Sequence, residues 1–144
     1  MNKIVKGKSM TAEETFLNDH LEREGLVVTE TDLGEWIIQL AGQTPSHMVM
    51  PAIHLSRKEV AELFTKVTGQ VQDPEDINGM VKVARRELRQ VFLDAEMGIT
   101  GANFAIAETG TIGLVTNEGN GRLVTTLPRV HVALVGFDKL VPDL

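Results

Sequence analysis

The chain has 144 residues, of which 42% are hydrophobic and 24% charged, with a formal net charge of −6 at pH 7. This is the composition of one globular domain, covering residues 1–144, and not of a disordered segment. The absence of cysteine excludes disulfides, thiolate zinc sites, iron–sulfur ligation and a cysteine nucleophile.

Two broad classes of partner are not expected from the composition. No basic stripe with interleaved aromatic residues appears, so we do not expect nucleic acid binding. No apolar run approaches the ~20 residues that span a bilayer, so we do not expect a membrane partner. The N-terminal sequence MNKIVKGKSM lacks the apolar core of a signal peptide, and we therefore expect a cytoplasmic protein.

Short β-branched runs alternate with amphipathic stretches in the first third of the chain. Lys3–Lys6 and Leu26–Thr29 favour strands. The segments Thr11-Ala-Glu-Glu14 and Asp32-Leu-Gly-Glu35 have the spacing of capping boxes. They predict two helices, each of which ends at a glycine. These glycines are Gly25 and Gly42.

The middle of the chain continues this alternation. Met48–Met50 favours a brief strand that stops at Pro51, and Ser56-Arg-Lys-Glu59 forms a third capping box. Asp73-Pro74 places an N-cap before a proline at the first helical position. The long helix that we expect after it ends near Gly98.

Strand-like runs dominate the last third. They are Asn103–Ala107, Ile112–Thr116 and Val130–Val135, whereas Arg122–Leu127 fits both a strand and a short helix. Alternating strands and helices predict an α/β fold with a mainly parallel sheet and helices on both faces.

The parallel sheet predicts where a site lies, because ligands bind beyond the carboxyl ends of such strands. Three residues follow early strands: Lys8, Ser9 and His54. Two polar clusters follow later strands. The first consists of Glu108, Thr109 and Gly110, and the second consists of Asn117, Glu118, Gly119 and Asn120. If the flanking strands are neighbours, Glu108 and Glu118 face one cleft. Both clusters also fit ordinary Asn- and Gly-rich turns.

The sequence does not match known phosphate-binding or metal-binding motifs. Gly119-Asn-Gly121-Arg-Leu-Val124 begins like a dinucleotide fingerprint but has valine at the third glycine position. A short helix at Arg122 would still let backbone N–H groups of this segment bind an anion. His47 and His54 are separated by a proline and the expected strand, so we predict no metal site.

Several segments resemble the LUD domain of the lactate utilization protein B family. They are KGKSMT, VTETDLGEWIIQLAG, PSHMVMPAIH and GITGANFAIAETGTIGLVTNEGNGR…LPRVHVALVGFDKLVP. The resemblance runs from Lys3 to Pro142. It implies a fold similar to the NagB/RpiA/CoA-transferase group, a short helix at Arg122–Leu127, and participation in the oxidation of L-lactate to pyruvate.

The chain departs from this family pattern at both ends. The family continues into a cysteine-rich, cluster-binding region, so we expect no iron–sulfur cofactor in this chain and no activity of the chain alone. Family members also carry a further N-terminal segment. We therefore expect an excerpt of a longer protein, whose exposed sheet would favour a homo-oligomer.

Three functions follow as alternatives. In the first, Lys8 and Ser9 hold a small anionic ligand, while Glu118 and Glu108 orient it with Asn117 and Asn120, and His54 exchanges a proton. The second is CoA-transferase or isomerase chemistry with a strand-end glutamate as nucleophile, which rests on fold analogy. The third is a non-catalytic docking domain for other subunits of a lactate oxidation complex.

Overall fold

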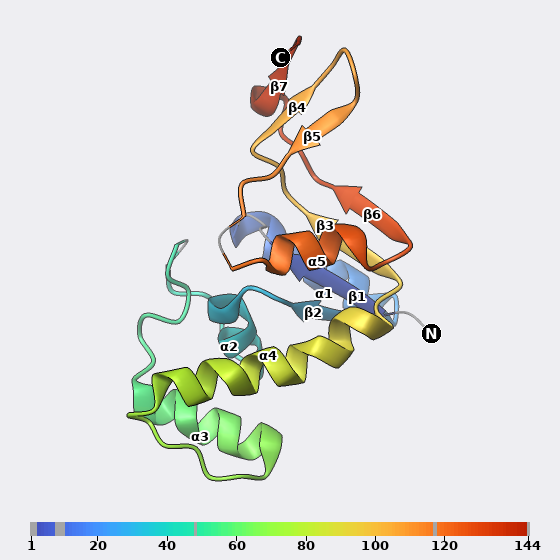
Figure 1. Cartoon of the computed structure of the whole chain (residues 1–144). Helices are drawn as coiled ribbons and strands as arrows, with labels where there is room; N and C mark the ends of the chain where they lie inside the picture. Colours follow the sequence, from blue (N-terminus) through green and yellow to red (C-terminus); the bar gives the residue numbers. More distant parts are fainter. Residues whose placement is uncertain (1–2, 8–10, 48, 117, 144) are drawn as a thin grey trace.

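The computed structural model describes residues 3–7, 11–47, 49–116 and 118–143. The chain forms an α/β body from which a small second sheet projects (Figure 1). In the described part of the chain, no helix is long and apolar enough to cross a membrane.

The body is built on a four-stranded sheet with the strand order β2-β1-β3-β6. Its strands are β1 (Lys3–Gly7), β2 (Val27–Glu30), β3 (Met97–Thr100) and β6 (Val130–Ala133). All three neighbouring pairs are parallel. The mainly parallel sheet expected from the alternating pattern is therefore confirmed.

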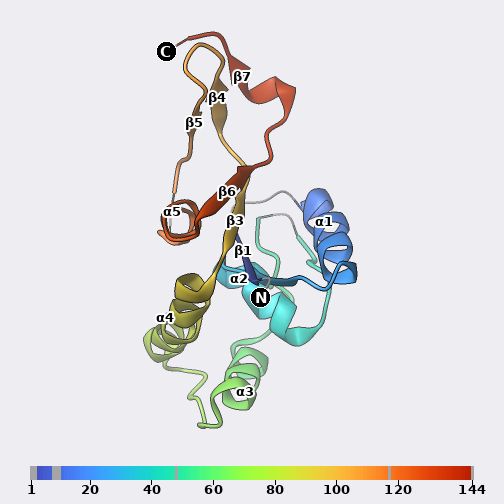
Figure 2. The same cartoon turned by 90° about the vertical axis from the view of Figure 1, so that its right-hand side faces the viewer.

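Helices cover both faces of this sheet, as expected. In Figure 2 the helix α1 lies on one side of the sheet, and α4 and α5 lie on the other. The bounds of the helices are Thr11–Arg23 (α1), Leu33–Ala41 (α2), Arg57–Thr68 (α3), Ile77–Asp94 (α4) and Asn120–Thr126 (α5).

The period-two alternation of β1 explains why the core has two parts. Ile4 packs with Val28 and Ile99 in a cluster that Leu17 and Leu21 of α1 cover. Val5 points to the opposite face and joins a larger cluster built from α2, α3, α4 and α5. Each large apolar side chain buried in this way stabilises the fold by about 1.5–3 kcal/mol.

Local capping fixes where the helices begin. The Asp32 side chain accepts a hydrogen bond from the Gly34 N–H at 3.2 Å, and Ser56 forms the predicted capping box with Glu59. The predicted N-cap at Asp73-Pro74 is wrong. The helix α4 starts three residues later, because the Asp76 side chain accepts from the Gly79 N–H at 2.8 Å.

The outer edge of β2 is closed by a side chain. The Gln39 Nε2 donates to the Val28 carbonyl at 2.7 Å, and its Oε1 accepts from the Glu30 N–H at 3.0 Å. One amide of α2 thus makes the hydrogen bonds that a further strand would make, and it satisfies groups that an edge strand leaves unpaired.

The strand β3 was missed by the sequence pattern, which placed Gly98 at a helix end. Gly98 lies inside β3, and a Cβ there would collide with the carbonyl oxygen of Val124 in α5. The glycine therefore permits close packing of a helix on the sheet, which a one-dimensional pattern cannot distinguish from a helix stop.

The second sheet overturns another prediction. Its strands are β4 (Phe104–Ile106), β5 (Thr111–Gly113) and β7 (Leu140–Val141), in the order β5-β4-β7. The strands β4 and β5 are antiparallel, whereas we expected these segments to lie in the parallel sheet. Only residues 107–110 join the two strands, and a parallel crossover needs a dozen or more residues.

Two further segments are settled. Asn120–Thr126 is helical, so the resemblance chose correctly between a strand and a helix for the Arg122 segment. The strand predicted at Met48–Met50 is wrong for Val49 and Met50, which lie in irregular structure before Pro51. Met48 is outside the described residues.

Candidate functional site

The carboxyl ends of the four parallel strands meet along one edge of the main sheet. The registers pair Lys6 with Glu30, Gly7 with Thr100, and Thr100 with Ala133. Residues that follow these positions therefore lie along a common edge, where α/β proteins commonly bind ligands. We call this the strand-end edge.

Hydrogen bonds of Thr31 and Asn120 link three elements at this edge. Thr31 follows β2 and bonds to β1, and Asn120 is the first residue of α5 and bonds to Thr31. The Thr31 Oγ1 donates to the Lys6 carbonyl at 2.6 Å, and the Asn120 Nδ2 donates to Thr31 Oγ1 at 3.4 Å. Gly7 makes the approach possible, because a Cβ there would lie 2.8 Å from Thr31 Oγ1 and 3.3 Å from Asn120 Nδ2. The first residue of α5 is thereby held beside β1 and β2.

Glu118 lies against the first turn of α2. Partial burial of its carboxyl raises its pKa, the nearby charge of Asp32 raises it further, and a hydrogen bond from the Leu33 N–H acts in the opposite direction. The residue as a whole is exposed, so solvent screens much of this effect. The arrangement makes Glu118 a carboxylate that accepts a proton more readily than an ordinary surface glutamate.

Gly119 and Asn120 also reach the edge, as predicted. Gly119 is the N-cap of α5 with φ +85°, a left-handed conformation that favours glycine. This turn directs the Glu118 segment toward α2 and starts α5 at Asn120. Three other predicted site residues, Lys8, Ser9 and Asn117, lie outside the described residues.

Glu108, Thr109 and Gly110 form the turn of the β4–β5 hairpin instead. The Glu108 N–H donates to the Pro142 carbonyl at 3.1 Å, and the Thr109 Oγ1 donates to Thr111 Oγ1 at 2.9 Å. This turn is exposed and lies at the far end of the projecting sheet (Figure 1). Antiparallel pairing separates Glu108 from Glu118, so the structure does not bring the two glutamates to one cleft.

His54 lies in the loop between α2 and α3. Its Nδ1 is 2.7 Å from Ser46 Oγ, and its Nε2 is 2.6 Å from Gln43 Oε1. Because a carbonyl oxygen only accepts, this orientation of Gln43 assigns a proton to Nε2. His54 does not follow a strand, in contrast to the expectation, and both of its ring nitrogens already have partners.

The His54 loop nevertheless packs against the beginning of α2. A Cβ at Gly34 would lie 2.8 Å from Pro51 Cγ, which shows how closely the loop approaches the helix. Glu118 contacts the same first turn. The loop and the Glu118 segment thus both lie next to the α2 N-terminus.

A buried ion pair beneath the edge was not identified from the sequence. The Lys6 Nζ donates to Glu30 Oε1 at 3.0 Å and to Asn18 Oδ1 at 3.0 Å, and the two charged side chains are 1% and 7% exposed. Lys6 and Glu30 each lie two residues after Ile4 and Val28, so the period of two places them on the same, α1-covered face of the sheet. This period of two was the signal from which the sequence could have placed Lys6 and Glu30 on one face. The contribution of Asn18 depends on tertiary packing.

The described residues include no cluster of three or more histidine, aspartate or glutamate side chains arranged to hold a metal ion. The chain also has no cysteine. Its donor set therefore does not fit an iron–sulfur cluster, which is held by thiolates.

Comparison with known proteins identifies close relatives over almost the whole chain. Lactate utilization protein B of Exiguobacterium sp. is 53% identical over 142 residues, and that of Bacillus subtilis is 50% identical over 142 residues. The "Uncharacterized electron transport protein YkgF" of Escherichia coli is 48% identical over 140 residues. These alignments cover 97%, 98% and 97% of this chain.

The chain spans only about 30% of the length of these relatives, with 30%, 29% and 29% covered. No solved structure matches the chain, so the similarity to the NagB/RpiA/CoA-transferase group stays a prediction. The model of the LUD domain matches residues 1–144, and the chain therefore belongs to the LUD domain family.

Proposed function

We propose that this LUD domain binds a small anionic ligand at the strand-end edge and contributes to the oxidation of L-lactate to pyruvate within a larger protein. Two relatives that share half of its residues are named lactate utilization protein B. The observation that carries the proposal is the position of Glu118, which contacts the first turn of α2 at this edge.

The chemistry of a 2-hydroxy acid matches this arrangement. Its carboxylate needs N–H donors and positive charge, for which the predicted ligands Lys8 and Ser9 are suited. Its hydroxyl group donates a hydrogen bond, for which a carboxylate is a strong acceptor. In this proposal Glu118 accepts the hydroxyl proton, and Asn120 orients the ligand.

In this proposal, the electrons of the reaction are accepted outside this chain. Oxidation of lactate to pyruvate releases two electrons and two protons. Glu118 takes the hydroxyl proton, and we propose that cofactors elsewhere in the larger protein or in other subunits accept the two electrons together with the hydrogen of the C–H bond. The proposed role of this domain is to bind the ligand and to hold one proton.

A matched pair of glutamate variants tests the proposal. Ligand binding is measured by titration calorimetry with L-lactate and with pyruvate, using wild type, Glu118→Gln and Glu108→Gln. We expect Glu118→Gln to weaken L-lactate binding by about tenfold, because a charged acceptor is lost, and to affect pyruvate, which has no hydroxyl group, much less.

Glu108→Gln is the control, since its carboxylate lies at the hairpin turn. If both variants weakened lactate binding equally, a shared cleft would be supported and the strand-end site would be rejected. Absence of any saturable heat with either acid would reject ligand binding by this domain.

A docking role is a second candidate because the projecting sheet carries exposed apolar side chains. Phe137 is 95% exposed, and Leu140 is 51% exposed. Such residues commonly mark a protein interface. Capture of the other subunits of a lactate utilization system, compared between wild type and Phe137→Ser, tests this role. Capture that is unchanged in the variant rejects this surface.

A further inference from the structure

The edge strand β6 carries a row of exposed apolar side chains. Val132 pairs in register with Ile99 of β3, which belongs to the cluster that α1 covers. With the strand period of two, Val130 and Leu134 lie on the same face as Val132. These three side chains are 47% (Val130), 42% (Val132) and 47% (Leu134) exposed. The helix α1 therefore covers β2, β1 and β3 but leaves the row on β6 in contact with solvent.

The backbone of β6 has an outer side with which no strand in the described part of the chain pairs. The Leu134 N–H donates toward β3, to the Thr100 carbonyl at 2.8 Å. Successive residues of a strand direct their N–H and C=O groups to alternate sides, so His131 and Ala133 direct theirs away from the sheet. An extended chain fits this side, because a strand supplies donors and acceptors at the required spacing.

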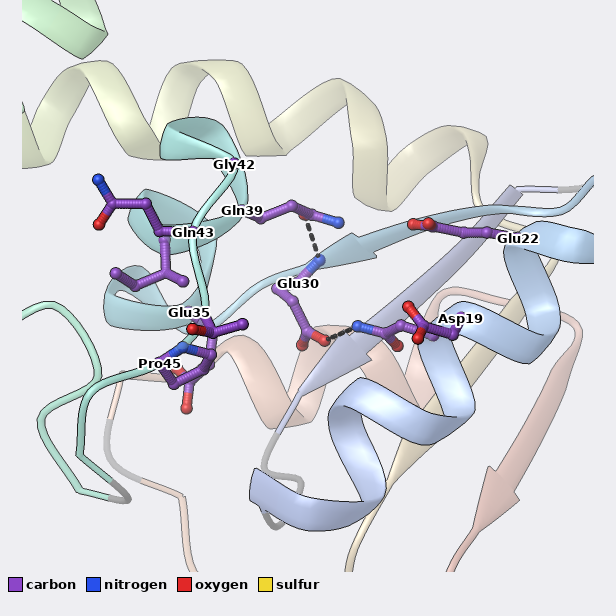
Figure 3. Close-up of a pocket in the computed structure, with 11 residues that line it drawn as sticks. Asp19, Glu22, Glu30, Glu35, Gln39, Gly42, Gln43 and Pro45 are labelled. Atoms are coloured by element: carbon purple, nitrogen blue, oxygen red, sulfur yellow. Dashed lines mark hydrogen bonds between the residues drawn. The ribbon is translucent and has the colours of Figure 1, made fainter.

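The sequence of β6 does not discourage such pairing. Edge strands are usually protected by lysine, by proline or by an inward-pointing charge, and the stretch Val130–Leu134 contains none of these. The other edge strand, β2, is different, because the Gln39 side chain reaches its backbone at Glu30, as Figure 3 shows. A further strand therefore fits the main sheet at β6.

A second copy of β6 matches this strand in one antiparallel register. With a two-fold axis at Val132, His131 of each copy lies opposite Ala133 of the other, and their outward backbone groups exchange hydrogen bonds. Val132 then lies opposite Val132, and Val130 lies opposite Leu134. The same register thus pairs the backbone groups and joins the two apolar rows on one face of the sheet. On the other face, the small Ala133 side chain leaves room for the imidazole of His131.

We propose that this domain forms a symmetric dimer in which the β6 strands of two copies pair antiparallel. Two such edge segments bury on the order of 1,000 Å² in total, which is at the low end for specific interfaces. Because the two strands run in opposite directions, the strand-end edges of the two copies point away from each other. The dimer therefore leaves both candidate sites open, and it does not depend on the function proposed for them.

Sedimentation equilibrium of the chain tests the proposal. We expect a monomer–dimer equilibrium with a dissociation constant of about 10–100 µM, as the modest area implies. A protein that stays monomeric at about 500 µM would overturn the proposal, and the outer side of β6 would then be left for another part of a longer protein. Assemblies larger than a dimer would also contradict it.

A substitution at the axis locates the interface. Val132→Lys places two positive charges directly opposite each other in place of two apolar side chains, so it should weaken dimerisation at least about tenfold. Val27→Lys is the control, since Val27 is 59% exposed on the other edge strand, β2. This control should leave dimerisation unaltered. Equal effects of the two variants would show that β6 is not the interface.

A mixture of two variants tests the register. Val132→Lys and Val132→Glu should each be monomeric where the wild type is dimeric, whereas an equimolar mixture should form a heterodimer. Opposite charges meet in the mixture only if position 132 pairs with the same position of the other copy. Circular dichroism and melting temperatures establish that each variant is folded. Two folded variants that fail to associate would reject the axis at Val132.

Amide hydrogen exchange, measured by NMR, distinguishes β6 pairing from other dimers. The outward N–H groups of His131 and Ala133 should exchange at least about threefold more slowly in the wild-type dimer than in Val132→Lys. The Leu134 N–H is bonded to Thr100 within the sheet, so its protection should be the same in both proteins. Equal exchange of the outward groups in both proteins would place the interface elsewhere and refute the proposal.

Discussion

At the scale of single residues, the Lys6–Glu30 pair is an interaction whose disruption is costly, because both of its charges are buried. Both side chains are almost fully buried, and Asn18 forms a hydrogen bond with each of them. Removing one partner of such a pair leaves an uncompensated charge. We predict that Lys6→Met lowers the free energy of unfolding by about 3–5 kcal/mol, measured by urea denaturation.

The double variant Lys6→Met/Glu30→Met distinguishes this cause from simple loss of contacts. It replaces the pair by apolar groups and should recover most of the stability. A double variant that is no more stable than Lys6→Met would show that the unpaired Glu30 charge is not the source of the loss.

Glu118 provides a residue-scale prediction about pH. Its pKa is raised in the folded protein above the usual value of 4.5, so the folded state binds a proton more tightly than the unfolded state. The corresponding contribution to stability is fully present below pH 4.5, and it is lost as pH rises through the raised pKa. At neutral pH, the ionised Glu118 next to Asp32 therefore destabilises the fold slightly.

We predict that Glu118→Gln raises the melting temperature at pH 7 and has no effect near pH 4. The gain is less than about 1 kcal/mol, because solvent screens an exposed carboxylate. Asp32→Asn keeps a capping side chain but removes a negative charge that also interacts with the N-terminus of α2, so it is not an equivalent test. A melting-temperature difference that grows as the pH falls would contradict this sign.

At the scale of elements, the contact between α5 and β3 determines the geometry of the strand-end edge. Gly98 lets the Val124 carbonyl approach β3, and α5 in turn carries Asn120 to Thr31. We predict that Gly98→Ala lowers the free energy of unfolding by at least about 1–3 kcal/mol through overpacking, measured by urea denaturation.

The same variant links packing to the site. A displaced α5 would move Asn120 away from Thr31, so Gly98→Ala should also weaken any ligand bound at the strand-end edge. If Gly98→Ala had the stability of the wild type, α5 and β3 could move apart without loss of stability.

At the scale of the whole molecule, the projecting sheet contributes little to the core of the body. Neither core cluster contains a residue of β4, β5 or β7. Phe137 precedes β7 and is 95% exposed. We predict that Phe137→Ser changes the free energy of unfolding by less than about 0.5 kcal/mol. A larger loss of stability would mean that Phe137 packs against the protein in solution.

The sequence predicted the body of the molecule better than its projecting part. Periodicity and capping residues such as Ser56 and Glu59 are local signals, and they indicated the longer helices and a mainly parallel sheet, although β3 was missed and the helix at Asn120–Thr126 was implied only by the family resemblance. The hairpin was not predicted, because the two strand signals were considered without the length of the segment that joins them. Residues 107–110 are too few for a parallel connection.

The candidate site was only partly predictable, because its position depends on how the strands pair. Glu118, Gly119 and Asn120 were placed at the edge by applying the carboxyl-end rule to a strand that belongs to the second sheet. They lie at the edge because the connection after β5 leads into α5. Glu108 depended on strand pairing, which the pattern misjudged. The role of Asn18 at the Lys6–Glu30 pair requires knowledge of how α1 crosses the sheet, and this is a tertiary property.

The Gln39 amide has a consequence for how copies of this domain can assemble. A sheet with two open edges can add strands at both ends and grow into a filament, whereas a sheet with one open edge can pair only once. Since Gln39 occupies the Val28 carbonyl and the Glu30 N–H on the outer side of β2, β6 is the edge of the main sheet that this side chain leaves open. Association through that sheet would therefore stop at a closed, two-fold pair.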